Sequence, residues 1–365
     1  MKHQTTRYGE IPFYKIGTFG NTADAFISKK LFLEYKTKYS FPKKGDILIS
    51  ASGTIGKAVI YDGKPAYFQD SNIVWIDNDE TLVKNDFLFY AYSNVKWNTE
   101  HTTILRLYND NFRNTLIPLP PLNEQSTIAN ILSTLDRYLC ALDALILKKE
   151  GVKKALSFEL LSQRKRLKGF NQAWQRVRLG GICEIGNGEA YETLIVENGD
   201  FKLISLNSID IDGNLKNTMK RVNFYDNSLK QDDIVMVLSD VAHGDFLGLC
   251  AVIPSNDYVL NQRMGRLRIR NDCINILFLR LYINANQKYF KMQGQGSSQL
   301  NLSKKAIEDF EILLPPLNEQ IAIANILSAL DNEITSLKNK KRQFENIKKA
   351  LNHDLMSAKI RVLKK

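Results

Sequence analysis

One stretch of sequence occurs twice in this chain, and this duplication constrains the fold more than any other feature. Residues 119–136 read LPPLNEQSTIANILSTLD, and residues 314–331 read LPPLNEQIAIANILSALD, 195 positions further on. The similarity continues without a gap to Arg166 and Arg361. Two copies with so long a period are not the pattern of a solenoid of short repeats. The sequence therefore predicts a duplicated unit, in which a variable block is followed twice by a shared helical block.

Each shared block predicts a long helix. A pair of prolines opens each block, and because proline is excluded from helix interiors, the helix is expected to begin just after it. Asn123 and Asn318 are the expected N-caps, and Glu124 and Glu319 then lie in the first turn, where the helix dipole favours negative charge. About 40 residues at 1.5 Å each correspond to a helix of roughly 60 Å.

Apolar residues follow a heptad pattern along both helices, which predicts that the two helices pair with each other as a coiled coil. The expected pairing residues are Ile128, Leu132, Leu135, Leu139 and Leu142 in the first helix, and Ile323, Leu327, Leu330, Ile334 and Leu337 in the second. Four lysines interrupt this seam, and we expect a modest kink there or side chains that extend out of the seam: Lys149, Lys153, Lys341 and Lys348.

Composition places the chain among globular proteins with an anionic partner. Its 365 residues allow two to three domains, and the net charge of +11 favours a nucleic acid, although much of this charge lies on the helices. The four scattered cysteines are expected to be free thiols. With no secretory signal and no apolar run long enough to span a bilayer, we expect a cytoplasmic protein.

Both variable blocks are expected to be rich in β-strands bounded by turn residues. In the first block, strands are predicted at 11–16, 45–50, 58–61 and 72–76, with a helix at 87–92 and a basic, aromatic loop region at 29–44. In the second block, strands are predicted at 201–206, 233–239, 249–253 and 264–269, with a short helix at 303–308. The two blocks align loosely, with Asp46 matching Asp233 and Gln69 matching Gln262.

Candidates for catalysis are few. The segment 51–58 lacks the first glycine and the Ser or Thr that a phosphate-binding loop needs, so we interpret it as a glycine turn between two strands. No histidine has partners at the spacing of a triad or a metal site. Residues 239–245, with Asp240 and His243, are the one stretch that could form an enzymatic site, although a polar loop is the simpler interpretation.

The double LPPLNEQ motif, each time followed by a heptad helix, resembles the specificity (S) subunit of Type I restriction–modification enzymes. The resemblance covers essentially the whole chain and implies an α+β protein with a pseudo-two-fold internal repeat. Two related globular α/β target recognition domains are separated by a pair of long antiparallel helices that form a coiled coil. The implied parts are domain 1 (residues 1–117), helical region 1 (118–168), domain 2 (169–312) and helical region 2 (313–365).

The resemblance also implies the function and the partners. Each domain would read one half of a bipartite site in double-stranded DNA, and the helices would set the spacing of the half-sites. The chain would be non-catalytic and would bind no cofactor itself. Methyltransferase (M) subunits, which bind S-adenosylmethionine, would dock on it, and restriction/motor (R) subunits would join for cleavage.

Candidate contact residues follow from side-chain chemistry, because amides and arginines suit base edges and lysines suit phosphates. For DNA in the first domain they are Lys29, Lys30, Lys43, Lys44, Ser52, Thr54, Lys57 and Gln69. For DNA in the second domain they are Lys220, Arg221, Ser239, His243, Asn261, Gln262 and Arg263. For subunit docking at the helix starts they are Asn123, Glu124, Gln125, Asn318, Glu319 and Gln320.

One departure from the family pattern concerns the first domain. Residues 174–198 precede Gly199 in the second domain, and nothing corresponds to them before Gly9 in the first, so that domain is expected to lack its opening segment. With antiparallel helices, residues 360–365 would return near the first domain and partly cover the gap. The alternative function is a coiled-coil scaffold that joins other proteins without reading DNA sequence.

Overall fold

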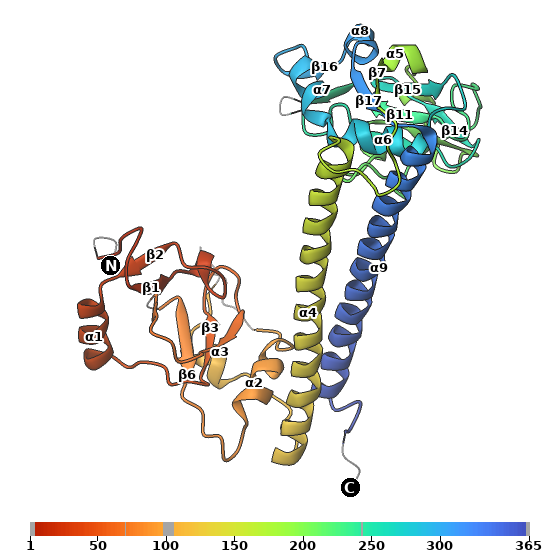
Figure 1. The fold of residues 1–365 in the computed structure, drawn as a ribbon. Helices are drawn as coiled ribbons and strands as arrows, with labels where there is room; N and C mark the ends of the chain where they lie inside the picture. Colours follow the sequence, from red (N-terminus) through yellow and green to blue (C-terminus); the bar gives the residue numbers. More distant parts are fainter. Residues whose placement is uncertain (1–3, 70, 98–105, 242–243, 363–365) are drawn as a thin grey trace. The chain divides into compact units, whose positions relative to one another are not determined.

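The chain divides into two compact units in the computed structural model, which describes residues 4–69, 71–97, 106–241 and 244–362. Unit 1 comprises residues 1–145 and 338–365, and unit 2 comprises residues 146–337. Helices α4 (Leu122–Leu161) and α9 (Leu317–Met356), each of 40 residues, run through both units (Figure 1). Each unit therefore holds one of the expected recognition domains together with part of each long helix.

Unit 1 is built on two three-stranded sheets, ordered β2-β1-β5 and β4-β3-β6. Its strands are β1 (Ile11–Tyr14), β2 (Ala25–Ile27), β3 (Ile47–Ser50), β4 (Ala58–Ile60), β5 (Tyr67–Phe68) and β6 (Ile73–Ile76). Its shorter helices are η1 (Ile16–Thr18), α1 (Lys29–Lys38), α2 (Asn85–Tyr92) and α3 (Asn109–Arg113). Ile47 and Ile49 of β3 pack against Leu88 and Tyr92 of α2, so the second sheet carries a helix on one face.

Unit 2 has a larger second sheet, ordered β13-β11-β15-β8, beside the three-stranded sheet β10-β9-β14 and the pairs β12-β16 and β17-β7. Its strands are β7 (Gln175–Arg178), β8 (Cys183–Asn187), β9 (Phe201–Ile204), β10 (Lys220–Val222), β11 (Ile234–Val237), β12 (Ser239–Val241), β13 (Cys250–Val252), β14 (Tyr258–Leu260), β15 (Met264–Ile269), β16 (Gln299–Asn301) and β17 (Glu311–Leu314). Its shorter helices are α5 (Leu179–Ile182), η2 (Glu192–Leu194), η3 (Leu206–Ser208), α6 (Ile276–Ala285), α7 (Gln287–Gln293) and α8 (Lys304–Glu308).

The two units share a topology. In each, the central strand of the first sheet has one antiparallel and one parallel neighbour. In the second sheet, Ile47 pairs with Ile76 in unit 1, as Ile234 pairs with Leu267 in unit 2. The predicted match of Asp46 with Asp233 agrees with this register. The predicted match of Gln69 with Gln262 is wrong by one residue, and Gln69 corresponds to Asn261. Each of these two residues directly follows the strand parallel to the central strand, and its backbone amide donates to the last carbonyl of that central strand.

The predicted loop at residues 29–44 is in part a helix. Ser28 accepts a hydrogen bond from the amide of Leu31 and caps α1, which places Lys29 and Lys30 in its first turn. The first predicted strand is also shorter than expected, because β1 ends at Tyr14 and a 3-10 turn begins at Ile16. The Ser28 cap sets the start of α1, and the 3-10 turn ends β1. Neither feature produces a clear hydrophobic periodicity in so short a segment, so the sequence pattern did not reveal them.

The predicted helix pairing is confirmed, and it is antiparallel within each unit. Among the predicted pairing residues, Ile128, Leu132, Leu142, Ile323, Leu327 and Ile334 are buried, and the other four are half-buried. The four seam lysines form ion pairs across the helices: Lys149 with Glu333 (2.8 Å), Lys341 with Asp143 (2.7 Å), Lys153 with Asp331 and Lys348 with Asp136. Their aliphatic stems thus cover the seam while their ammonium groups bind acids of the facing helix.

The helix starts are held by buried glutamines rather than by asparagine caps. α4 and α9 begin at Leu122 and Leu317, so the predicted N-caps Asn123 and Asn318 lie inside the first turn, and that prediction is wrong. In unit 2, Gln320 donates to the carbonyls of Pro315 (2.8 Å) and Cys273 (3.1 Å) and accepts from the amide of Asn275 (2.8 Å).

Gln125 makes the corresponding three bonds in unit 1. It donates to the carbonyls of Pro120 (2.8 Å) and Leu82 (3.1 Å) and accepts from the amide of Lys84 (2.8 Å). Both glutamines are 1% exposed, so each ties the start of a long helix to the start of the helix that covers the second sheet.

Replacing Gln320 by alanine tests this connection. The change leaves two carbonyls and one amide without their partner in a buried place, so we expect the free energy of unfolding to fall by about 3 kcal/mol. Asn318→Ala, at an exposed position two residues before Gln320, should change the free energy of unfolding by less than about 0.5 kcal/mol. Urea denaturation of both variants measures the difference, and equal losses would contradict the assigned role.

Candidate nucleic-acid interface

Basic side chains in unit 1 gather on α1 and on the turn before β3. Lys29 and Lys30 are exposed in the first turn of α1. Lys43 and Lys44 are exposed ahead of β3, where Lys43 lies 3.5 Å from Asp77. The ammonium of Lys36, also on α1, lies 5.4 Å from the centre of the Phe41 ring. These side chains can reach phosphate oxygens without breaking a buried contact.

Other predicted contacts in unit 1 serve the fold. Lys57 donates to the carbonyl of Phe19 (2.5 Å), and Gln69 accepts from the amide of Ile16 (3.3 Å). Ser52 donates to Asn72 (2.9 Å), while Thr54 is exposed at the tip of the β3–β4 turn. One polar atom of Lys57 and one of Gln69 thus bind backbone groups of distant segments, so both side chains have a role in the fold, and their contact with DNA stays a prediction.

The β3–β4 turn confirms the interpretation of segment 51–58 as a glycine turn between strands. Gly53 and Gly56 have φ values of +68° and +79°, which favour glycine. A Cβ on Gly56 would lie 2.3 Å from the indole nitrogen of Trp97, so the turn packs too closely for a larger residue. The backbone is thus committed to the turn and does not form a phosphate cradle.

In unit 2, three consecutive candidates surround one acid. Asn261 and Gln262 donate to the two carboxylate oxygens of Glu192, each at 2.9 Å. The hydrogen bond from Gln262 contributes most to holding the pKa of Glu192 below its ordinary value, and the bond from Asn261 and the nearby charge of Arg263 act in the same direction. Asn261 is buried and also accepts from the amide of Tyr191 (3.0 Å), whereas Arg263 is exposed. Arg263 is therefore the member of this group whose side chain is open to solvent.

The remaining candidates of unit 2 differ in availability. Lys220 is exposed on β10, while its neighbour Arg221 donates to the carbonyl of Gly199 (2.9 Å). Ser239 is buried and donates to Asn301 (2.5 Å). His243 lies outside the described residues. Asp240, the acid of the supposed enzymatic stretch, accepts from the amides of Val241 (2.8 Å) and Phe246 (2.7 Å), which is a role in closing the loop.

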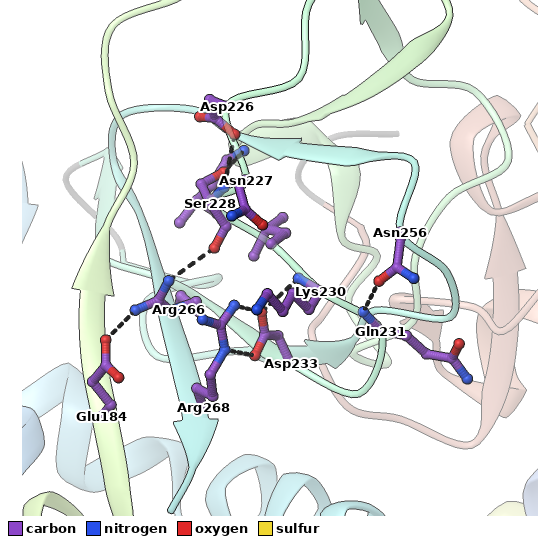
Figure 2. Close-up of polar contacts among 12 residues, drawn as sticks. Glu184, Asp226, Asn227, Ser228, Lys230, Gln231, Asp233, Asn256, Arg266 and Arg268 are labelled. Atoms are coloured by element: carbon purple, nitrogen blue, oxygen red, sulfur yellow. Dashed lines mark hydrogen bonds and ion pairs between the residues drawn. The ribbon is translucent and has the colours of Figure 1, made fainter.

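Two arginines of β15 were not singled out by sequence and are structural. Arg268 binds Asp233 through two hydrogen bonds of 2.8 and 2.7 Å, and Asp233 also accepts from the amide of Lys230. Figure 2 shows this clamp beside Arg266, which reaches Glu184 of β8 and the carbonyl of Ser228 (3.0 Å). Part of the positive charge is therefore neutralised inside unit 2.

The predicted docking group at the helix starts is turned inward. Glu124 is buried and binds Arg361 (2.6 Å) at the end of the chain that the structure describes, while Gln125 holds the backbone near α2. The repeat produces the same arrangement in unit 2, where Glu319 binds Arg166 (2.5 Å) and the indole of Trp174 (2.9 Å). The sequence feature that could have predicted these ion pairs is the match of Arg166 with Arg361 in the internal repeat.

These contacts correct the docking prediction for four side chains. Glu124, Gln125, Glu319 and Gln320 have no free polar atom pointing to a partner, because the other helix and the covering helix already bind them. Asn123 and Asn318 are exposed and stay candidates. Arg361 also brings the C-terminal residues into unit 1, as expected from antiparallel helices.

Neither a membrane span nor a metal site is found among the residues that the structure describes. No helix there is long and apolar enough to cross a membrane, and no cluster of His, Cys, Asp and Glu has the arrangement of a metal site. The four cysteines are free thiols, as predicted, and burial raises the pKa of Cys183 to about 12.

The chain belongs to the family described as Type I restriction modification DNA specificity domain, whose model matches residues 1–149 and 171–346. It is a specificity subunit, the non-catalytic component of such systems. A specificity subunit of a type I restriction enzyme from Methanocaldococcus jannaschii is 28% identical over 368 residues, which cover 93% of this chain and 84% of that protein.

Two further relatives are similar over different lengths. A Haemophilus influenzae protein named as a type I restriction enzyme specificity subunit is 64% identical over 133 residues, or 36% of this chain and 34% of that protein. The crystal structure of the S subunit from M. genitalium has a TM-score of 0.65 at 19% identity, covering 98% of this chain and 91% of that one. The similarity to the M. genitalium structure shows that this chain and that S subunit share a fold.

The ion pair of Glu124 predicts a pH-dependent contribution to stability. The Arg361 guanidinium holds the pKa of Glu124 below its ordinary value of 4.5, so the pair stabilises the folded chain above that pH and is lost as the pH falls through the lowered pKa. We expect the urea midpoint of the wild type to exceed that of Glu124→Gln at neutral pH, and the gap to close on acidification. Glu34→Gln, at an exposed position on α1, serves as the control. A gap that does not narrow at any acidic pH at which the wild type still folds would contradict this assignment.

Proposed function

We propose that each unit reads one half of a bipartite site in double-stranded DNA. The observation that carries the proposal is the double occurrence of one fold: the DNA specificity family matches both halves of the chain, and the two units share their sheet topology. Most surface residues differ between the halves, so the two half-sites are expected to differ in sequence. The alternative, a coiled-coil scaffold that does not read DNA sequence, has no support in the family or in the described part of the chain.

The long helices are proposed to set the spacing of the half-sites and to dock the partner subunits. Each helix has 40 residues, which corresponds to about 60 Å. That length exceeds one turn of DNA, as two separated half-sites require. We propose that M subunits, carrying S-adenosylmethionine, bind this helical part, and that R subunits join for cleavage. The chain itself is proposed to hold no cofactor.

A selection experiment tests the bipartite reading. The chain is purified together with its methyltransferase subunits and incubated with duplexes that contain a random region, and the bound or methylated molecules are sequenced. We expect two fixed half-sites separated by a fixed number of unspecified base pairs. A single contiguous site, or the absence of any sequence preference at physiological salt, would contradict the proposal.

Variants separate phosphate contacts from base reading. Replacing Lys29 and Lys30 together by alanine should weaken binding to all duplexes alike and lower the salt dependence, log K against log salt, by about 2, because about one counterion is released per phosphate contact. Arg263→Ala should instead relax the preference in one half-site by about 1–3 kcal/mol and leave the other unchanged. Lys64→Ala, on an exposed turn beside Asp62, is the control. Equal effects of Arg263→Ala on both half-sites would remove this residue from base reading.

A further inference from the structure

The turn between β14 and β15 in unit 2 is held at both ends by backbone hydrogen bonds. At its start, the amide of Asn261 donates to the carbonyl of Ile204 (3.0 Å), the last residue of β9. At its end, the carbonyl of Arg263 accepts from the amide of Leu238 (2.9 Å), which follows β11. The backbone of the turn is therefore tied to both sheets of the unit.

Contacts with the segment after β8 fix the centre of this turn. The amide of Gln262 donates to the carbonyl of Glu189 (2.6 Å). A Cβ on Gly188 would lie 2.1 Å from the carbonyl oxygen of Asn261, so this close approach requires glycine. Arg263 has a φ of +69°, in a region that residues other than glycine rarely adopt. The surrounding contacts thus keep the turn in a conformation that its own sequence would seldom choose.

Unit 1 anchors its corresponding turn in the same way but fills it with other residues. The amide of Gln69 donates to the carbonyl of Tyr14 (2.9 Å), and the carbonyl of Asn72 accepts from the amide of Ala51 (2.8 Å). Residues 69–72 thus stand where unit 2 has residues 261–263, so the turn of unit 1 is one residue longer. A shared frame that bears different side chains suits two readers of different base sequences.

Glu192 fixes the orientation of the side-chain amide of Gln262. Its ionised carboxylate can only accept hydrogen bonds, and one oxygen accepts from Nε2 of Gln262 (2.9 Å). The amide cannot turn over without placing its own oxygen against this carboxylate. The other carboxylate oxygen accepts from Asn261 (2.9 Å), which is buried and accepts from the amide of Tyr191 (3.0 Å). Glu192 is therefore anchored at one oxygen and orients Gln262 with the other.

The oriented amide keeps one donor and one acceptor for a ligand. Nε2 of Gln262 carries two hydrogens, of which one binds Glu192, and no described residue donates to its Oε1 atom. In the major groove, adenine presents the complementary pair, because N6 donates and N7 accepts. Guanine presents two acceptors there, cytosine only a donor, and thymine only an acceptor beside its methyl group. The free donor and acceptor of Gln262 therefore match adenine best.

We propose that Gln262 reads an adenine in the half-site of unit 2, and that Glu192 is the positioning residue that orients its amide for this contact. Oε1 accepts from N6 of the adenine, and Nε2 donates its second hydrogen to N7. With the amide turned over, a donor would face a donor and an acceptor an acceptor, so the orientation set by Glu192 decides whether adenine is accepted. This inference rests on the proposed reading of DNA and names the base that the turn recognises.

Base analogues in DNA test the contact on the unaltered chain. The chain is purified with its methyltransferase subunits, and its half-sites are identified by selection from random duplexes. Binding is then measured with 7-deazaadenine, which lacks the N7 acceptor, in place of each adenine of both strands in turn. We expect one adenine of one half-site at which this replacement weakens wild-type binding about tenfold, as the loss of part of a bidentate contact allows. The same replacement should leave binding by Gln262→Ala unchanged.

Variants of Glu192 test the orientation of the amide. In Glu192→Gln, the facing side chain offers a donor as well as an acceptor, so the amide of Gln262 can turn over. We expect the preference for adenine over the other bases to fall about fivefold at this one position, while the rest of both half-sites stays as in the wild type. Glu189→Gln is the matched control, because it removes the same charge from an exposed neighbouring carboxylate without touching the amide. It should keep the adenine preference.

The possible results separate this inference from the proposed function. A wild-type chain that selects no half-sites would overturn both. Two selected half-sites in which no adenine contact depends on Gln262 would overturn this inference alone and leave the bipartite reading in place. If Glu192→Gln weakens binding to all duplexes alike and keeps the adenine preference, Glu192 only supports the fold and its assignment as a positioning residue is wrong.

Discussion

The structure depends on how each long helix begins. A glutamine and a glutamate at adjacent positions are both buried there: Gln320 binds the backbone ahead of α6, and Glu319 binds Arg166 near the end of α4. Gln125 and Glu124 repeat these contacts with α2 and with Arg361. Because buried polar groups must be paired, these residues fix a globular unit, the start of one helix and the end of the other in a single arrangement. The LPPLNEQ motif is thus explained by internal contacts.

The same junction links the fold to the function. A target reader positions its base contacts only if the domain that bears them is held firmly on its support. In each unit the support is the antiparallel helix pair, whose apolar seam is bordered by lysines that bind acids of the facing helix, such as Lys153 with Asp331 and Lys348 with Asp136. The exposed residues proposed to contact DNA, Lys29 and Arg263 among them, lie on loops and short elements outside this support.

The duplication also makes one half of the chain a reference for the other. Unit 2 completes its second sheet with β8 and its core with α5, and among the described residues of unit 1 no strand or helix takes the equivalent places. The substitutions between the halves are consistent with this difference: acids that bind the arginines of β7 in unit 2 are Asn114 and Leu116 in unit 1.

The sequence by itself determined the elements that depend on local periodicity and on repetition. Heptads predicted the paired helices with Leu132 and Leu327 in the seam, and the repeat predicted two domains of one fold. The partners of individual polar side chains were decided by the tertiary structure. Lys57 and Gln69 looked like DNA contacts but bind backbone groups of Phe19 and Ile16, and Asp233 is clamped by Arg268, 35 positions away. No local pattern encodes these choices, because a hydrogen-bond partner is selected by which segments the fold brings together.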